Sequence, residues 1–107
     1  MEKTLHFAYE RQNREDLIKS IGGSGKVILT NIIDRGHPNG AERFELTEKG
    51  IIYVYNVRTN RQITVLFARV GQLYSRFGSK FDELPSTTQE GVKAYCRKWK
   101  MLGYNER

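Results

Sequence analysis

Two neighbouring runs of β-branched and aromatic residues constrain the fold of this chain more than any other feature. They lie within the stretch GIIYVYNVRTNRQITVLFAR and cover Ile51–Tyr55 and Ile63–Phe67. Such residues suit the pleated surface of a β-sheet. The polar segment between them contains Asn56 and Asn60, and asparagine side chains hydrogen-bond their own backbone in turns. The sequence therefore predicts a β-hairpin, which we expect in the middle of a sheet because neither of its faces is fully polar.

Further strands and a helix are predicted before this hairpin. Strand-like composition recurs at Thr4–Tyr9, Lys26–Ile33 and Phe44–Thr47. For the first of these segments, an initial turn of helix is the alternative. Apolar residues at helical spacing predict a short helix over Asn13–Ile21, with Asn13 as its N-cap.

Two more helices are predicted after the hairpin. Residues 71–78 fit a short helix that ends at a glycine, and the stretch from there to Pro85 is predicted to be a linker within the domain. Thr87 and Glu90 have the spacing of a capping box at the start of a long helix over Thr87–Leu102. We therefore predict one α+β domain over residues 1–107: an antiparallel sheet of four to five strands with a short N-terminal helix and a C-terminal helix packed on it.

The charge of the chain indicates a polyanionic partner. It has 18 Lys and Arg against 12 Asp and Glu, which gives a formal net charge of +6. A positive field of this size attracts nucleic acid, and the alternative is that the charge serves solubility alone. The single Cys96 has no partner for an internal disulfide, and no Cys/His cluster has the spacing of a metal site. We expect no metal and no cofactor.

The same composition predicts a soluble, cytoplasmic protein. The first residues, MEKTLHFAYERQ, lack the apolar run of a signal peptide. No segment approaches the roughly 18 consecutive apolar residues of a membrane span. A lone cysteine also fits a reducing compartment.

One segment concentrates the reactive side chains. Residues 34–43, DRGHPNGAER, combine loop-forming Gly, Pro and Asn with Asp, Arg, His and Glu. Metal-free RNA cleavage needs a base, an acid and cations that stabilise the charge on the phosphate. His37 and Glu42 are the candidates for the proton transfers, and the alternative is that the histidine is incidental. The candidates for binding phosphate are the arginines Arg43, Arg58, Arg61 and Arg69.

Aromatic and basic residues elsewhere are candidates for holding RNA. Tyr53 and Tyr55 lie on one face of the hairpin, where their rings can stack on bases. The basic residues of the last helix form either a phosphate track or a solvated face. Its apolar residues, including Trp99, are expected to pack on the sheet. The predicted nucleic-acid contacts are Arg35, Arg58, Arg61, Tyr53, Tyr55, Lys93, Arg97 and Lys100.

The order of the predicted elements resembles that of RelE-type and barnase-like small ribonucleases. A strand and a helix come first, further strands follow, and GIIYVYNVRTNRQITVLFAR is similar to the final hairpin of those toxins. The similarity covers most of the chain before the last helix, which is longer than the pattern requires. The resemblance implies a metal-independent endoribonuclease of toxin type, whose site residues would be His37, Glu42, Arg43, Thr64 and Arg69.

Three functions remain open from the sequence. The first is this RNA-cleaving enzyme, and the second is a noncatalytic nucleic-acid-binding module that uses the same surfaces. The third is a small adaptor or inhibitor, such as a mobile element encodes, that docks on a host protein through the hairpin edge or the loop. A protein partner, either an antidote or a host target, is expected for the first and the third. Cleavage of RNA in EDTA, salt-dependent binding and capture of a specific protein distinguish the three.

Overall fold

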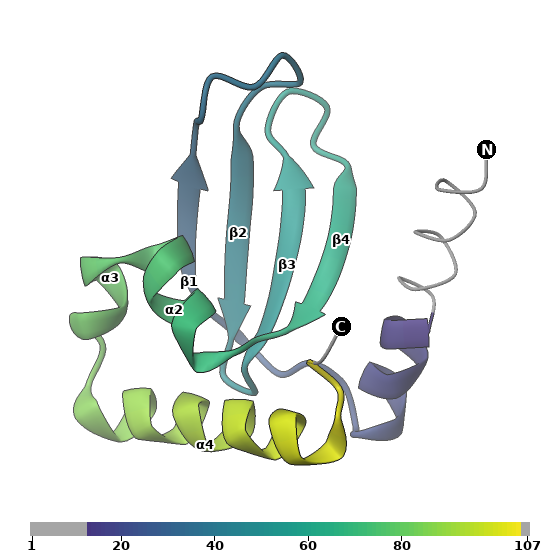
Figure 1. Ribbon diagram of the computed structural model, residues 1–107, viewed down its shortest axis with the longest axis vertical. Helices are drawn as coiled ribbons and strands as arrows, with labels where there is room; N and C mark the ends of the chain where they lie inside the picture. The colour runs from purple at the N-terminus through teal and green to yellow at the C-terminus, as the bar shows by residue number, and fades with distance from the viewer. Residues whose placement is uncertain (1–12, 106–107) are drawn as a thin grey trace.

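A four-stranded antiparallel sheet forms the centre of the computed structural model, which describes residues 13–105 (Figure 1). The strands are β1 (Val27–Ile33), β2 (Glu42–Thr47), β3 (Ile51–Asn56) and β4 (Gln62–Phe67). They lie side by side in the order in which they follow along the chain. The predicted α+β class with an antiparallel sheet is confirmed.

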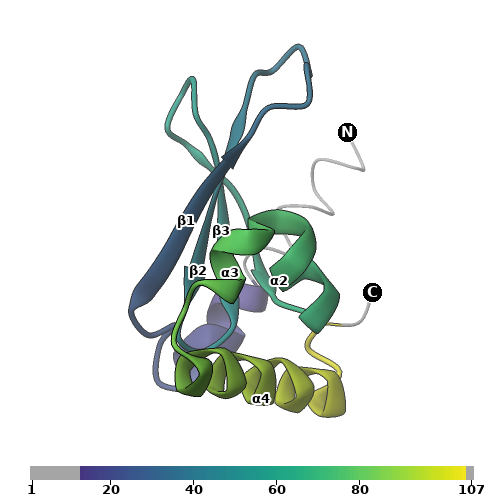
Figure 2. The ribbon, with the colours of Figure 1, turned by 90° about the vertical axis from the view of Figure 1, so that its left-hand side faces the viewer.

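The helices flank the lower half of the sheet. Residues 13–20 form the first helix, and α2 (Val70–Phe77), α3 (Ser79–Asp82) and α4 (Ser86–Leu102) follow the last strand. In Figures 1 and 2, α2 and α3 cover one face of the sheet and α4 runs across its lower end. The upper halves of the strands, with the loops that join β1 to β2 and β3 to β4, extend beyond these helices.

Each face of the sheet packs its own apolar cluster. Phe44 and Ile52 belong to the cluster that contacts α2 and α3, and Phe67 belongs to the cluster on the opposite face. Helix α4 contributes to both, with Cys96 in the first and Trp99 in the second. Burial raises the pKa of the Cys96 thiol to about 12, so the thiol is neutral at physiological pH. The predicted packing of Trp99 is confirmed, because this side chain is only 1% exposed.

Of three predictions about the hairpin and the N-terminal part, two need correction and one lies outside the described residues. The predicted strand at Thr4–Tyr9 belongs to the residues that the structure does not describe. Asn13 is already helical and is not the N-cap of its helix. Within residues 13–105, β4 is the last strand of the sheet, so the hairpin does not lie entirely in the middle of the sheet that these residues form. Arg14, in the helix over residues 13–20, contacts β4 by donating to the carbonyl oxygen of Val65 at 3.2 Å.

Two predictions about the C-terminal part are wrong. The expected linker before Pro85 contains helix α3, because Phe81 is fully buried and anchors this turn of helix in the core. Helix α4 begins at Ser86, with Pro85 at the N-cap position and no side-chain cap. Thr87 therefore lies inside the first turn, and the predicted capping box with Glu90 does not form.

Candidate functional site

A groove of about 790 Å³ lies at the upper end of the sheet, between the β1–β2 loop (residues 34–41) and the β3–β4 turn (residues 57–61). We name it the tip groove. Ile33, Glu42 and Asn56 are direct cross-strand neighbours on β1, β2 and β3, so their side chains share the face that lines it. The charged and titratable residues that line the groove are Arg35, His37, Glu42, Arg58 and Arg61.

Hydrogen bonds connect the two walls of the groove. Three hydrogen bonds join them: Val57 N–H to the Ala41 oxygen at 3.0 Å, Asn56 Nδ2 to the Asn39 oxygen at 2.8 Å, and an Arg58 NH2 group to the Pro38 oxygen at 3.2 Å. Because the walls are held in place before any ligand arrives, little conformational freedom is lost on binding.

The groove carries an excess of positive charge. Three arginines and one carboxylate line it. Within residues 13–105, the side chains of Arg35, Arg61 and Glu42 make no hydrogen bond or ion pair. Arg58 uses one donor on the Pro38 carbonyl and keeps its others. Guanidinium groups that lack a protein partner are suited to bind phosphate, which they contact through two parallel N–H donors.

His37 is held by the loop that contains it. Its Nδ1 accepts the backbone N–H of Asn39 at 3.1 Å, and its carbonyl oxygen accepts the N–H of Gly40 at 2.9 Å. A nitrogen that accepts a hydrogen bond carries no proton, so the neutral ring has its proton on Nε2. The imidazole therefore offers a donor, and not an acceptor, to a ligand.

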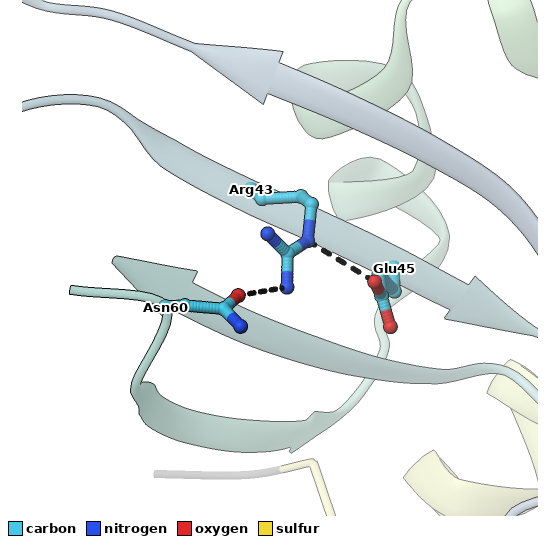
Figure 3. Close-up of polar contacts among 3 residues, drawn as sticks. All are labelled: Arg43, Glu45 and Asn60. Carbon is cyan, nitrogen blue, oxygen red and sulfur yellow. Dashed lines mark hydrogen bonds and ion pairs between the residues drawn. The ribbon is translucent and has the colours of Figure 1, made fainter. Parts of the chain in front are cut away.

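Arg43 lies on the opposite face of the sheet (Figure 3). Its Nε donates to Glu45 Oε2 at 3.1 Å, and its NH2 group donates to Asn60 Oδ1 at 3.0 Å. Its guanidinium carbon lies 4.6 Å from the centroid of the Tyr55 ring. The sequence predicted that Glu42 and Arg43 lie in a loop, but both are residues of β2. Because they are consecutive in a strand, their side chains point to opposite faces of the sheet.

Tyr53 and Tyr55 share that opposite face with Arg43. Their ring centroids are 6.5 Å apart. Desolvation, and next the charge of Glu45, raise the pKa of Tyr55, so its phenol is neutral. The structure separates these two predicted RNA contacts from the tip groove by the thickness of the sheet.

Thr64 and Arg69 also lie outside the tip groove. Thr64 is on β4, where its hydroxyl oxygen accepts a hydrogen bond from Arg14 at 3.4 Å. Arg69 follows the opposite end of β4 and donates from Nε to the Asn105 oxygen at 2.8 Å. Of the five positions that the ribonuclease resemblance implies, the structure brings together the histidine and the glutamate, and it places the other three elsewhere.

The predicted contacts on α4 lie at the other end of the sheet. Arg97 and Lys100 line a second hollow of about 450 Å³, together with Arg69. Lys93 lies over the Tyr74 ring, with Nζ 5.5 Å from the centroid, and the neighbouring Tyr74 side chain raises the pKa of Lys93. The six residues of β4 separate the two ends by roughly 20 Å, at about 3.3 Å per residue.

Two asparagines build the groove although the sequence did not single them out as site residues. Asn56 bonds the Asn39 carbonyl across the groove and accepts the Thr59 N–H at 3.0 Å within its own turn. The sequence indicates the turn role, because Asn is typical of turns. The hydrogen bond from Asn56 to the Asn39 carbonyl depends on the order of the strands in the sheet. No pattern in the sequence near either residue predicts it.

No family model, curated protein or solved structure matches this chain. The ribonuclease resemblance therefore stays a prediction, and the function must be argued from the groove itself. Within residues 13–105, no group of three or more His, Cys, Asp or Glu side chains is placed to hold a metal ion. The helices of this part of the chain are too short or too polar to cross a membrane.

Proposed function

We propose that this protein binds single-stranded RNA through the tip groove. The observation that carries the proposal is the meeting of Arg35, Arg58 and Arg61, from two different loops, around one groove. The net charge of +6 supports it, because a positive field raises the local concentration of a polyanion. Single-stranded RNA is favoured over a duplex because unpaired bases can enter a groove between two loops.

The residues of the groove have distinct roles in this proposal. Arg35 and Arg61 bind phosphate oxygens, since their guanidinium groups have no partner within residues 13–105. Ile33 and Ile63 supply apolar surface against a base. The carboxylate of Glu42 accepts a hydrogen bond from a ribose 2′-hydroxyl, the group that distinguishes RNA from DNA.

Replacing Arg35 and Arg61 together by alanine tests the binding proposal. We expect about tenfold weaker binding for each arginine, or about 1.4 kcal/mol each. The slope of the logarithm of affinity against the logarithm of salt concentration should flatten by about 0.7 for each lost phosphate contact. Fluorescence anisotropy with a labelled single-stranded RNA at several salt concentrations measures both quantities.

The matched control is the double variant Arg97→Ala/Lys100→Ala. It also removes two positive charges, but at the other end of the sheet. It should bind RNA almost as tightly as the unaltered protein, and circular dichroism should show both variants folded. Equal losses in the two double variants would mean that net charge alone attracts RNA, and the groove would then not be the binding site.

The second candidate is a metal-independent endoribonuclease that acts in the same groove. It is favoured because His37 and Glu42 line one hollow together with three arginines. Glu42 would take the proton of the ribose 2′-hydroxyl while the 2′-oxygen attacks the phosphorus. His37 would protonate the departing 5′-oxygen. This role for His37 requires a second ring proton at Nδ1, which would displace the Asn39 N–H that now occupies it. Binding without cleavage is therefore the first proposal.

Cleavage is tested with the variants Glu42→Gln and His37→Ala on free RNA in EDTA and, with magnesium present, on RNA bound to translating ribosomes. If the protein cleaves, each variant should lose at least about a hundredfold in rate, because general acid and base catalysis contributes about 10²–10⁴-fold. Both variants should still bind RNA, since the phosphate-binding arginines remain. An absence of cleavage on both substrates would exclude the enzyme and leave the binding proposal intact.

A further inference from the structure

The hollow of about 450 Å³ at the end of the sheet opposite the tip groove has the features of a second binding site. We name it the basal hollow. Its volume falls within the roughly 300–1,000 Å³ of small-molecule pockets. In Figures 1 and 2, the start of α2 lies above α4, so segments far apart in the sequence form its walls. The residues of these walls that bear on binding are Arg69, Val70, Gly71, Cys96, Arg97 and Lys100.

The basal hollow is strongly positive. Three cationic side chains line it, and no carboxylate of residues 13–105 does. Arg97 and Lys100 lie three positions apart on α4, so their side chains share one side of that helix. An adjoining hollow of about 160 Å³ shares Arg69 and adds Arg14, again without a carboxylate of the described residues. Charges of one sign repel each other at close range, and a bound anion offsets that repulsion.

These cations have donors available for a ligand. Within residues 13–105, the side chains of Arg97 and Lys100 make no hydrogen bond or ion pair. Arg69 donates from Nε to the Asn105 oxygen at 2.8 Å, which fixes its guanidinium group and keeps the two terminal NH2 groups for a ligand. The hollow therefore combines one cation that is held in place with two that can adjust to an anion.

The charge and the surface of the hollow indicate the class of ligand. A phosphate monoester carries about 1.5 to 2 negative charges at pH 7, whereas each phosphodiester of an RNA strand carries one. Guanidinium groups contact phosphate through two parallel N–H donors, and a lysine adds a point charge. Val70 and the neutral thiol of Cys96 border the cations and offer apolar surface to an organic group.

We propose that the basal hollow binds a small phosphate monoester. Arg69, Arg97 and Lys100 bind the phosphate oxygens, and the organic group lies against Val70. A ligand has room at Gly71, where an added Cβ would meet no atom within 4 Å. This site does not depend on the RNA binding proposed for the tip groove, because the two hollows share no residue.

A nuclear magnetic resonance titration of the ¹⁵N-labelled protein tests the site, with phenyl phosphate as the probe and constant ionic strength. We expect the largest shifts at the amide signals of Val70, Gly71 and Arg97. Methyl phenyl phosphate is the matched diester, with a similar size and a single negative charge. It should bind at least about tenfold more weakly, because it has fewer charged oxygens for the three cations.

Two double variants separate this site from the tip groove. Arg97→Ala/Lys100→Ala should weaken the binding of phenyl phosphate at least about tenfold and leave the affinity for RNA with hydroxyl ends almost unaltered. Arg35→Ala/Arg61→Ala should have the reverse effect. Circular dichroism should show both variants folded.

Three results would overturn the proposal. They are equal affinities for the monoester and the diester, shifts confined to the tip groove, and unaltered binding of phenyl phosphate by Arg97→Ala/Lys100→Ala. A protein that binds phenyl phosphate in the basal hollow and binds no RNA would support this proposal and contradict the one for the tip groove.

Discussion

Trp99→Ala is expected to lower the free energy of unfolding by about 3–5 kcal/mol, the range for removing a large buried aromatic side chain. Trp99 is 1% exposed, and its ring packs against Phe67 with centroids 5.0 Å apart and against Tyr104 with centroids 5.8 Å apart. Its Nε1 donates to the Lys49 carbonyl at 2.9 Å. Alanine would leave a cavity and an unpaired carbonyl at the point where α4 meets the sheet.

Urea denaturation followed by far-UV circular dichroism measures this effect, because the variant has no tryptophan left to report by fluorescence. The matched control is Trp99→Phe, which keeps an aromatic ring and removes the hydrogen bond. It should cost about 1–3 kcal/mol, the range for leaving a buried polar group unpaired. A loss below about 1 kcal/mol in Trp99→Ala would contradict the packing of α4 described above.

Gly50→Ala is expected to lower the free energy of unfolding by about 2–5 kcal/mol. Gly50 has a φ of +72°, which strains any residue with a Cβ by about 1–2 kcal/mol. A Cβ there would also lie 3.3 Å from Trp99 Nε1 and 3.4 Å from Cys96 Sγ. Because both neighbours are buried and close-packed, overpacking adds about 1–3 kcal/mol.

Gly36→Ala separates the two contributions. Gly36 has nearly the same φ, +74°, but no atom lies within 4 Å of the position of an added Cβ. Its substitution should cost only the strain of about 1–2 kcal/mol. Equal effects at the two positions, measured by urea denaturation, would show that the buried contacts around Gly50 tolerate a methyl group.

The elements of the sheet were predictable from the sequence, because their signals are local. The β-branched and aromatic runs place β3 and β4 within one or two residues of their observed bounds, and the strand at β1 likewise. The short helix α3 was not predictable in this way. Its four residues form a turn of helix because the Phe81 side chain is buried in the core. The site that Phe81 fills is formed by the sheet and α4, so the residues of α3 alone do not predict the helix.

The candidate site was predictable in part. The arginines at 35, 58 and 61 and the histidine at 37 belong to two loops that meet because both connections lie at the same end of the meander. The sequence did not indicate the separation of Glu42 from Arg43, since this follows from a strand that begins at Glu42 and not at Phe44. An error of two residues in a strand boundary therefore changed which side chains were expected to act together.

The order of the strands also bears on how the chain folds. Each strand pairs with the strand before or after it in the sequence, so each hairpin closes only a short loop and loses little entropy in doing so. Chains dominated by such local contacts have low contact order and fold quickly. The hydrogen bond from Trp99 to Lys49 spans 50 residues, so the docking of α4 on the sheet adds contacts of high sequence separation to this local pattern.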